Sequence, residues 1–486
     1  MNIVEPILFQ ARHNPPAPAM CAPGAALNLI SYNRLARFIN NIGRRALTLG
    51  MAPGDTVAIH VKDHIFHAAI AFALANVGIA TLSVREPAFP PGLRVDALIT
   101  DDSMLMGTPA GLKVVRADLG WAEGDDRPLD ERQLYRGPGD AICRIALTSG
   151  STGEAKAVAF SHSNQLARLA RYNHTYGGAF PSCTRIFCDL GLPSSVGFRH
   201  LLYVLSRGGT FFFPGASPMD TLQTFELYRV QGLIASPGGL SGFLKFYEEN
   251  SAFHCSFDVV IATGSALPAL LSQRVRARLC SNLVYYYGTT ETGTATSAPA
   301  HALMSIPGAV GYVAPDVKVE IVNDAGRLVA QGGEGALRIS SPVSVAGYLG
   351  DPVLSAQAFR DGYFYTGDTG HFMPDGMLVI SGREGDVLNL GGDKVKPQMI
   401  EEVLTAFGPV GQAAVCTRPN ALGIEEVWAI VVPNGTLDEV ALRSHCQQRL
   451  PVGCVPARFV TVDRLPRNEN GKVERHRLVE VLPGSG

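Results

Sequence analysis

The chain carries the stretch Thr148-Ser149-Gly150-Ser151-Thr152-Gly153-Glu154-Ala155-Lys156 between two short apolar runs, residues 142–147 and 157–160. Both runs are typical of buried strands. A turn rich in glycine and hydroxyl groups, with one lysine, offers several N–H and O–H donors that suit the phosphates of a nucleotide. It is not a Walker A loop, because Ala157 follows Lys156 where that loop requires serine or threonine. The alternative is an ordinary surface hairpin turn, since Gly, Ser and Thr are common turn residues.

Four further motifs follow in order along the chain. They are Tyr287-Gly288-Thr289-Thr290-Glu291, Tyr365-Thr366-Gly367-Asp368, Gly382-Arg383-Glu384-Gly385-Asp386 and Pro466-Arg467-Asn468-Glu469-Asn470-Gly471-Lys472. Together with residues 148–156 they resemble the motifs of the adenylate-forming superfamily, which includes acyl-CoA synthetases, peptide-synthetase adenylation domains and firefly-type luciferases. The resemblance runs from about residue 31 to residue 472, is specific at these motifs, and favours an acyl-CoA synthetase-like ligase.

Composition sets bounds on the class of protein. A length of 486 residues exceeds a usual single core, so two or more domains are expected. Apolar residues at 46% and charged residues at 17% describe a soluble globular protein. A net charge of −2 gives no electrostatic reason to expect a nucleic acid or an anionic membrane as partner.

Cysteine usage and the N-terminus bear on the compartment. Nine cysteines, an odd number without a CxxC pair, argue against a disulfide framework or a zinc site and favour a reducing, cytoplasmic location. Residues 1–6 show no secretory signal. Residues 65–84 are apolar enough to suggest a membrane span, but they contain His67, Asn76 and Gly78, so we expect a core helix that leads into a buried strand.

Strands and helices alternate over most of the first 300 residues, after a Pro- and Ala-rich start that reads as a loosely held arm. Ser31 is expected to cap a helix that ends near residue 46. We expect strands at residues 56–61, 79–84, 185–190, 210–213, 233–235, 259–262 and 283–287, with helices at residues 65–75, 161–171, 197–206, 239–247 and 268–279. This alternation is typical of βαβ units and a largely parallel sheet.

The later part of the chain changes in texture. Short strands with frequent glycine between residues 307 and 382 predict a β-rich subdomain, and residues after about 386 predict a compact α+β unit. The fold class is therefore α/β: a large N-terminal domain of mostly parallel sheets flanked by helices, with the β-rich subdomain, and a small mobile α+β domain. We expect the large adenylation domain at residues 1–384 and the small lid domain at residues 385–486.

The resemblance implies a role for each motif. Lys156 and the loop from Thr148 to Gly153 would hold the β- and γ-phosphates of ATP, Thr290 would donate to the α-phosphate, and Glu291 would bind Mg²⁺, which prefers oxygen ligands. Nucleotide contacts are assigned to Thr148, Ser149, Gly150, Ser151, Thr152, Gly153, Lys156, Gly264, Ser265, Ala266, Tyr287, Gly288, Thr289, Asp368 and Arg383. Among these, the flat face of Tyr287 suits adenine and the Asp368 carboxylate suits the two ribose hydroxyls.

The C-terminal motif carries the catalytic lysine that the resemblance implies, Lys472, which acts when the small domain closes. Rotation of that domain would pivot about Gly385, where the family usually has Asp or Lys; glycine keeps the pivot possible. The resemblance implies that an α-amino acid substrate would be held through its amino group by an Asp near residues 194–197. No acid lies there, so a simple carboxylic acid is favoured over an α-amino acid. Phe198, His200 and Tyr286 are the candidates for the acyl pocket, although His200 is more often a packed helix residue than a catalyst.

The predicted function is an ATP-dependent acid–thiol ligase. It would convert a carboxylic acid to an acyl-adenylate with release of pyrophosphate and then transfer the acyl group to coenzyme A. One alternative is a stand-alone adenylating enzyme that loads the phosphopantetheine of a separate carrier protein. A second is a nucleotide-binding regulator without catalysis, which the presence of both Lys156 and Lys472 disfavours.

Overall fold

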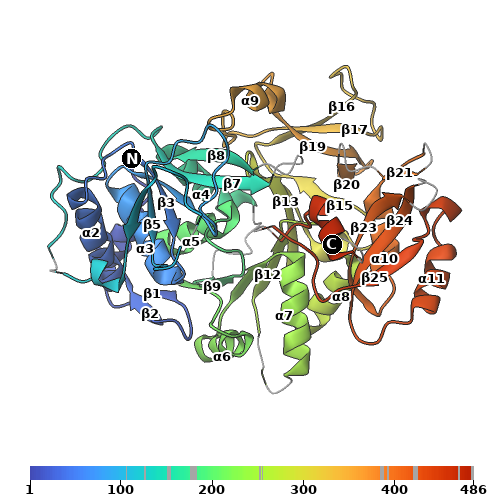
Figure 1. Cartoon of the computed structure of the whole chain (residues 1–486), viewed down its shortest axis with the longest axis horizontal. Helices are drawn as coiled ribbons and strands as arrows, with labels where there is room; N and C mark the ends of the chain where they lie inside the picture. Colours follow the sequence, from blue (N-terminus) through green and yellow to red (C-terminus); the bar gives the residue numbers. More distant parts are fainter. Residues whose placement is uncertain are drawn as a thin grey trace.

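The computed structural model describes residues 1–105, 107–124, 127–149, 155–175, 183–250, 253, 256–383, 388–390, 393–419, 425–468 and 471–482. Two large sheets and the helices around them form the N-terminal part, and a small separate unit forms the C-terminal part, drawn in red in Figure 1. This arrangement agrees with the α/β class expected from the sequence.

The first sheet has six strands in the order β6-β5-β3-β4-β7-β8. Its strands are β3 (Thr56–His60), β4 (Ala80–Ser83), β5 (Ala97–Thr100), β6 (Lys113–Arg116), β7 (Ile142–Ser149) and β8 (Ala155–Ser161). All neighbours are parallel except β7 and β8, which form an antiparallel hairpin around the phosphate-loop motif.

The second sheet is longer and changes character along its width. Its path is β16-β17-β19-β20-β15-β14-β13-β12-β11-β9-β10-β1-β2, with β18 paired to β19. The strands are β1 (Pro18–Cys21), β2 (Leu29–Ser31), β9 (Arg185–Cys188), β10 (Thr210–Phe212), β11 (Gly232–Ala235), β12 (Val259–Thr263), β13 (Leu283–Thr289), β14 (Gly293–Pro299), β15 (Ala309–Val313), β16 (Lys318–Val322), β17 (Gly335–Ser340), β18 (Phe359–Arg360), β19 (Tyr363–Phe372) and β20 (Leu378–Arg383). Along this path the neighbours from β1 to β13 are parallel, whereas β2 is antiparallel to β1 and the strands from β14 to β20 are antiparallel to their neighbours. The predicted β-rich subdomain is therefore hydrogen-bonded to the parallel strands through β14 and β15.

Helices cover both sheets and fill the space between them. They are α1 (Glu5–His13), α2 (Tyr32–Thr48), α3 (His64–Asn76), α4 (His162–Thr175), α5 (Ser195–Ser206), α6 (Pro218–Tyr228), α7 (Pro237–Glu249), α8 (Ala269–Arg278) and α9 (Pro352–Ala358). Helix α3 is buried on every side, as an apolar helix without a polar face must be. It packs against α5 through Phe72 and Phe198, and one buried cluster joins both helices to strands of the two sheets.

The expected core helix at residues 65–75 and the strand that follows it are confirmed as α3 and β4. Ser31 caps α2 as expected, because its hydroxyl accepts from the Arg34 N–H at 3.3 Å. Among the described residues, no helix has both the length and the apolar composition needed to cross a membrane.

The N-terminal arm was the clearest error of the sequence prediction. Residues 5–13 form α1, and β1 pairs in parallel with β10 inside the second sheet. The side chains of Ile3, Val4 and Ile7 are buried in the main core. Proline and alanine made this segment resemble a loose arm, but three aliphatic residues within five positions give it enough apolar surface to dock.

The C-terminal unit has its own core. Its strands are β21 (Leu388–Leu390), β22 (Asp393–Val395), β23 (Val410–Pro419), β24 (Glu425–Pro433) and β25 (Arg458–Thr461), and its helices are α10 (Pro397–Thr405) and α11 (Glu439–Gln447). Two hydrophobic clusters are built only from residues 388–482. Lys396, just before α10, donates a hydrogen bond to Glu334 of the large part, so the two parts are in contact.

Replacing Ile7 tests the docked N-terminus. Ile7 is 1% exposed, whereas Phe9 on the same helix is 48% exposed. We expect Ile7→Ala to lower the free energy of unfolding by about 2–4 kcal/mol through lost burial and a cavity, and Phe9→Ala to lower it by less than about 1 kcal/mol. Urea unfolding measures both. Equal, small effects would mean that the N-terminus is loosely held after all.

Acid should destabilise the fold through three buried histidines. Burial lowers the pKa of His67 to about 3, of His162 to about 4 and of His200 to about 3. The unfolded chain binds protons near pH 6.5 and the folded chain does not, so stability is full above about pH 6.5 and falls as the pH drops toward 4. Between pH 8 and pH 4, the urea midpoint should fall less steeply in His162→Gln than in the unaltered protein. In His13→Gln, which changes an exposed histidine, the midpoint should fall as steeply as in the unaltered protein. Identical slopes for all three would contradict this account.

Candidate functional site

The ends of β12 and β13 bring two of the predicted nucleotide-binding segments together. Thr263 pairs with Tyr286 in the parallel register, and the Tyr285 hydroxyl donates to the Ser265 carbonyl at 3.0 Å. Residues Gly264, Ser265 and Ala266 therefore lie beside the motif 287–291, at the edge of the sheet where α/β proteins bind ligands. The strand expected at residues 283–287 is longer in the structure, because β13 continues to Thr289.

Glycine at position 288 allows the close hairpin between β13 and β14. A Cβ atom at Gly288 would lie 2.2 Å from the Gly293 carbonyl oxygen, and the strand register shifts between Tyr287 and Gly288. Any side chain would push the two strands apart. The glycine therefore allows the close pairing that positions its neighbours, Tyr287 before it and Thr290 at the start of the turn.

Tyr287 and Asp368 meet although they are 81 residues apart. The Tyr287 hydroxyl donates to the Asp368 carboxylate at 2.6 Å, and the Asp368 N–H donates to the Thr366 hydroxyl at 2.9 Å. Asp368 also stands opposite Arg383 in the register of β19 and β20. Three predicted nucleotide-binding residues, Tyr287, Asp368 and Arg383, are therefore close together in the structure. Of Arg383, only the backbone is described.

Tyr348 joins Glu291 to the neighbourhood of Lys156. The Tyr348 hydroxyl donates to Glu291 Oε1 at 2.9 Å, and Lys156 Nζ lies 5.0 Å from the centre of the Tyr348 ring. Lys156 is held on β8, where it pairs with Thr148 of β7. Of the remaining loop, Ser149 is described only in its backbone, and Gly150, Ser151, Thr152 and Gly153 lie outside the described residues, as does Gly385.

The donor set around Glu291 fits a magnesium ion shared with phosphates. Oε2 of Glu291 forms no hydrogen bond with any described residue, which leaves one hard oxygen for a cation. Nowhere in the described ranges do three or more His, Cys, Asp or Glu side chains gather as a complete metal cage. A single carboxylate is what Mg²⁺ uses when a bound polyphosphate supplies further ligands.

Arg168 of α4 holds the backbone of the motif 287–291, and sequence reasoning missed it. Its Nη1 donates to the Thr290 carbonyl at 3.0 Å, and its Nη2 donates to the carbonyls of Glu291 at 2.9 Å and Val343 at 2.8 Å. The Thr290 hydroxyl lies 3.2 Å from the Ser195 hydroxyl at the start of α5. Helix α4, helix α5 and the loop at Val343 therefore converge on the same turn.

The three acyl-pocket candidates lie in the interior. Phe198, His200 and Tyr286 are 1%, 2% and 3% exposed. The Phe198 ring packs under the Arg144 guanidinium at 4.2 Å, and His200 Nδ1 lies 2.8 Å from the Val196 carbonyl. With a pKa of about 3, His200 is neutral near pH 7. Their part in acid binding stays a prediction.

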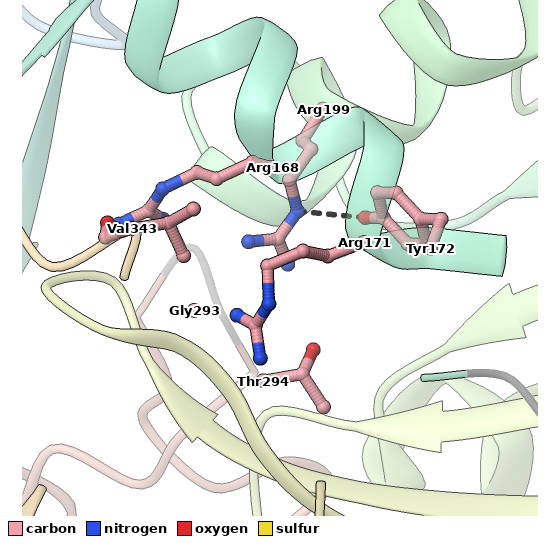
Figure 2. A pocket seen from close by; sticks show the side chains of 7 residues that line it. All are labelled: Arg168, Arg171, Tyr172, Arg199, Gly293, Thr294 and Val343. Atoms are coloured by element: carbon pink, nitrogen blue, oxygen red, sulfur yellow. Dashed lines mark hydrogen bonds between the residues drawn. The ribbon is translucent and has the colours of Figure 1, made fainter. Parts of the chain in front are cut away.

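Arg199, between Phe198 and His200, does line a cavity. Figure 2 shows this cavity of about 20 Å³ between α4, α5 and the start of β14. It is lined by Arg168, Arg171, Tyr172, Arg199, Gly293, Thr294 and Val343. The signal for Arg199 was present in the sequence, since it is the only Lys, Arg, Asp or Glu in residues 196–205, and a charged residue in an apolar helix is unusual without a partner.

The loop that carries Lys472 is docked on the large part of the chain. The Lys472 N–H donates to the Asn468 side chain at 2.9 Å. A Cβ atom at Gly471 would lie 2.5 Å from the Ser236 hydroxyl, at the N-terminus of α7. A cavity of about 460 Å³ lies at this junction, lined by residues of α7 and by Arg464 and Arg467. Strand β11, which precedes α7, neighbours β12, so this junction lies at the same sheet edge as residues 264–266.

Comparison with known proteins identifies the family of the chain. A family model described as AMP-binding enzyme matches residues 9–349, and one described as AMP-binding enzyme C-terminal domain matches residues 399–472. The chain is 29% identical over 93% of its length to CymA of Salinispora arenicola, described as a non-canonical nonribosomal peptide synthetase, but spans only 6% of that protein. It is 27% identical to a feruloyl-CoA synthase of an Amycolatopsis species, over 96% of both chains.

Among solved structures, o-succinylbenzoate CoA synthetase (MenE) from Bacillus subtilis, in complex with ATP and magnesium ion, shares the fold. The TM-score is 0.80 at 20% identity, covering 98% of this chain and 99% of that one. Because the first family model alone matches well over half of the 486 residues and the second matches the C-terminal part, the chain belongs to the AMP-binding enzyme family of the adenylate-forming superfamily.

Proposed function

We propose that this enzyme activates a carboxylic acid with ATP and transfers the acyl group to coenzyme A. Two hydrogen bonds support the proposal, one between Tyr287 and Asp368 and one between Tyr348 and Glu291. The loop that carries Lys472 is docked on the large part close to these residues. In the first step a carboxylate oxygen bonds to the α-phosphorus, the bond to the bridging oxygen breaks, and pyrophosphate leaves. In the second step the thiolate of coenzyme A attacks the acyl carbon and AMP leaves.

The nucleoside would bind between Tyr287 and residues 264–266. The hydrogen bond from Tyr287 fixes one oxygen of Asp368, which leaves the carboxylate oriented toward the ribose hydroxyls. Arg383, directly across the strand pair, would reach the same ribose and the phosphates. The backbone of Gly264, Ser265 and Ala266 would approach the base.

The polyphosphate would lie between Lys156 and Glu291. Lys156 and the loop from Thr148 to Gly153 would neutralise the leaving pyrophosphate, and Glu291 would hold Mg²⁺, which would supply further positive charge for the phosphates. Thr290, held by Arg168 from behind, would donate to the α-phosphate. An anion then attacks a polyanion only where these cations are already in place.

Lys472 would complete the site from the small domain. We propose a domain boundary between residues 384 and 385. The buried clusters of residues 388–482, which share no member with those of the large part, support a division into two domains. Rotation about Gly385 would withdraw Lys472 after adenylation and admit the thiol. A glycine pivot reaches a wide range of backbone angles.

The acceptor is the finer part of the proposal. Similarity along the full length to a feruloyl-CoA synthase supports coenzyme A, whereas similarity to a segment of CymA supports a carrier-protein phosphopantetheine. We favour coenzyme A because the feruloyl-CoA synthase matches over 96% of both chains. Loading of a separate carrier protein is the second candidate.

Pyrophosphate–ATP exchange with a panel of carboxylic acids tests the first step, and free coenzyme A added to the same panel tests the second. We expect exchange with at least one acid and formation of its acyl-CoA product. No exchange with any acid would favour a nucleotide-binding regulator, and acyl transfer only to a carrier protein would overturn the choice of coenzyme A.

Lys472→Ala is the informative variant in this assay. It should nearly abolish exchange and leave transfer from a supplied acyl-adenylate largely intact, because the lysine would act only in the adenylation position. Lys245→Ala, which removes an exposed lysine of α7, is the matched control and should leave both steps unchanged. Equal loss of both steps in Lys472→Ala would contradict the assigned role.

A further inference from the structure

The described part of the loop that carries Lys472 is held together by its own backbone. Arg467 and Val473 pair in an antiparallel bridge. The Asn468 N–H donates to the Lys472 carbonyl at 2.8 Å, and the Gly471 N–H donates to the Asn468 carbonyl at 2.9 Å. Gly471 has a φ of +73°, a conformation that glycine adopts without strain. Because these bonds fix the backbone of Lys472 within the loop, the place where the loop docks determines where the lysine can act.

Arg467 ties this loop to the sheet of the small domain. Its Nη1 donates to the Gly471 carbonyl, and its Nη2 donates to Gln412 Oε1 of β23 at 2.8 Å. Two bonds from one planar group hold it in a single orientation. Burial lowers the pKa of Arg467, which is consistent with a guanidinium shielded from water. The position of this side chain is therefore fixed by its own domain.

The same guanidinium rests on the large part of the chain. A Cβ atom at Gly238, in the first turn of α7, would lie 3.4 Å from Cζ and 3.4 Å from Nε of Arg467. In return, Gly471 of the loop approaches Ser236, the residue that caps α7 (green in Figure 1). Each part thus presents a glycine to a side chain of the other, which allows a close approach. Two such contacts fix the direction of the loop as well as its place, whereas one would leave it free to pivot.

We propose that Arg467 is a positioning residue for the first step, because it holds the Lys472 loop against the first turn of α7 while the lysine acts on the nucleotide. The inference rests on the proposed function and names the contact on which the catalytic lysine depends. In the second step the small domain would rotate, and the contact between Arg467 and Gly238 would be lost. Arg467 therefore matters for adenylation and not for acyl transfer.

The place of this contact suits the role. Helix α7 begins just after β11, and β11 pairs with β12, the strand that leads into residues 264–266. Neighbouring strands lie about 4.8 Å apart, so the docked loop is about one strand from the segment expected at the base. A misplacement of about 1 Å can cost about a hundredfold in rate, so even a small shift of the loop should slow the first step.

Arg467→Ala tests the role in pyrophosphate–ATP exchange, with the acid from the panel that supports exchange best. We expect kcat to fall about tenfold or more and KM for ATP to stay within about threefold, because the lysine is displaced and the nucleotide contacts are kept. Acyl transfer from a supplied acyl-adenylate should stay within about twofold. Arg467→Lys should restore part of the exchange, since an ammonium can donate to the Gly471 carbonyl but lacks the planar two-bond geometry of the guanidinium. Arg464→Ala, which removes an exposed arginine beside the same cavity, is the matched control and should change neither step.

Gly238→Leu tests the other side of the contact. A leucine there would occupy the space of the Arg467 guanidinium and should lower pyrophosphate exchange about tenfold or more. Gly242→Leu is the matched control on the same helix, because a Cβ atom at Gly242 would have no described neighbour within 4 Å. In the double variant Arg467→Ala/Gly238→Leu the leucine has room, so the second change should add less than about twofold to the loss from the first. Full multiplication of the two losses would contradict a direct contact.

Hydrogen–deuterium exchange separates undocking of the loop from unfolding of the small domain. Deuterium uptake by a peptide that covers residues 236–243 should rise in Arg467→Ala, while uptake by residues 427–432, which contribute to the core of the small domain, should not change. A rise in both, or an equal loss of pyrophosphate exchange and acyl transfer, would mean that Arg467 serves only the fold and would overturn the inference.

The same measurements keep the inference distinct from the proposed function. If pyrophosphate exchange occurs and neither Arg467→Ala nor Gly238→Leu lowers it, the proposed function stands and the inference fails. If no acid supports pyrophosphate exchange, the proposed function fails and the role of Arg467 fails with it.

Discussion

Hydrogen bonds from one buried guanidinium to three backbone carbonyls are the constraint on which the site depends. Arg168 binds the carbonyls of Thr290, Glu291 and Val343, and the Val345 N–H donates to the Glu291 carbonyl as well. The turn between β13 and β14 is thereby tied to α4 and to the loop that leads to Tyr348. Because these backbone positions are fixed, the Glu291 carboxylate meets Tyr348 and the Thr290 hydroxyl meets Ser195 without further adjustment.

Positively charged side chains are fixed in two regions near the motif 287–291. On one side of the motif 287–291, Lys156 and the docked loop of Lys472 belong to the region proposed for the polyphosphate. On the other side, the arginines of α4 and α5 surround a cavity of their own. Fixed charges that are already oriented stabilise an anion more than mobile ones, since they need no reorganisation when charge develops.

Sequence patterns predicted the elements well where periodicity was strong. The apolar run of α3 and the alternation from β3 to β13 gave the parallel sheets, and glycine-rich short strands gave the antiparallel end. The motifs also predicted that Tyr287 and Asp368 belong to one site. Motifs that follow the order of a known family imply which distant residues come together, and local propensity does not. The N-terminus was misjudged because its composition outweighed the three aliphatic residues that dock it.

Other residues escaped prediction for a physical reason. Tyr348 and Arg168 act through contacts across 57 and about 120 residues, which no local pattern encodes. For α5, the sequence indicated a pocket helix but not which of its faces points inward; Phe198 and His200 pack into the core while Arg199 reaches the cavity. Side-chain direction depends on the rotation of a helix against its neighbours, and tertiary packing sets that rotation.

Calorimetric titration of Mg²⁺–ATP into Arg168→Met tests most directly the claim that this arginine positions Glu291 for the nucleotide. Arg171→Met is the comparison, because Arg171 shares the cavity but binds Asp316 and Ser341 rather than the carbonyls of the motif. We expect Arg168→Met to weaken the affinity about tenfold or more while the protein stays folded by circular dichroism, and Arg171→Met to stay within about twofold of the unaltered protein. An unchanged Kd in folded Arg168→Met would contradict the account.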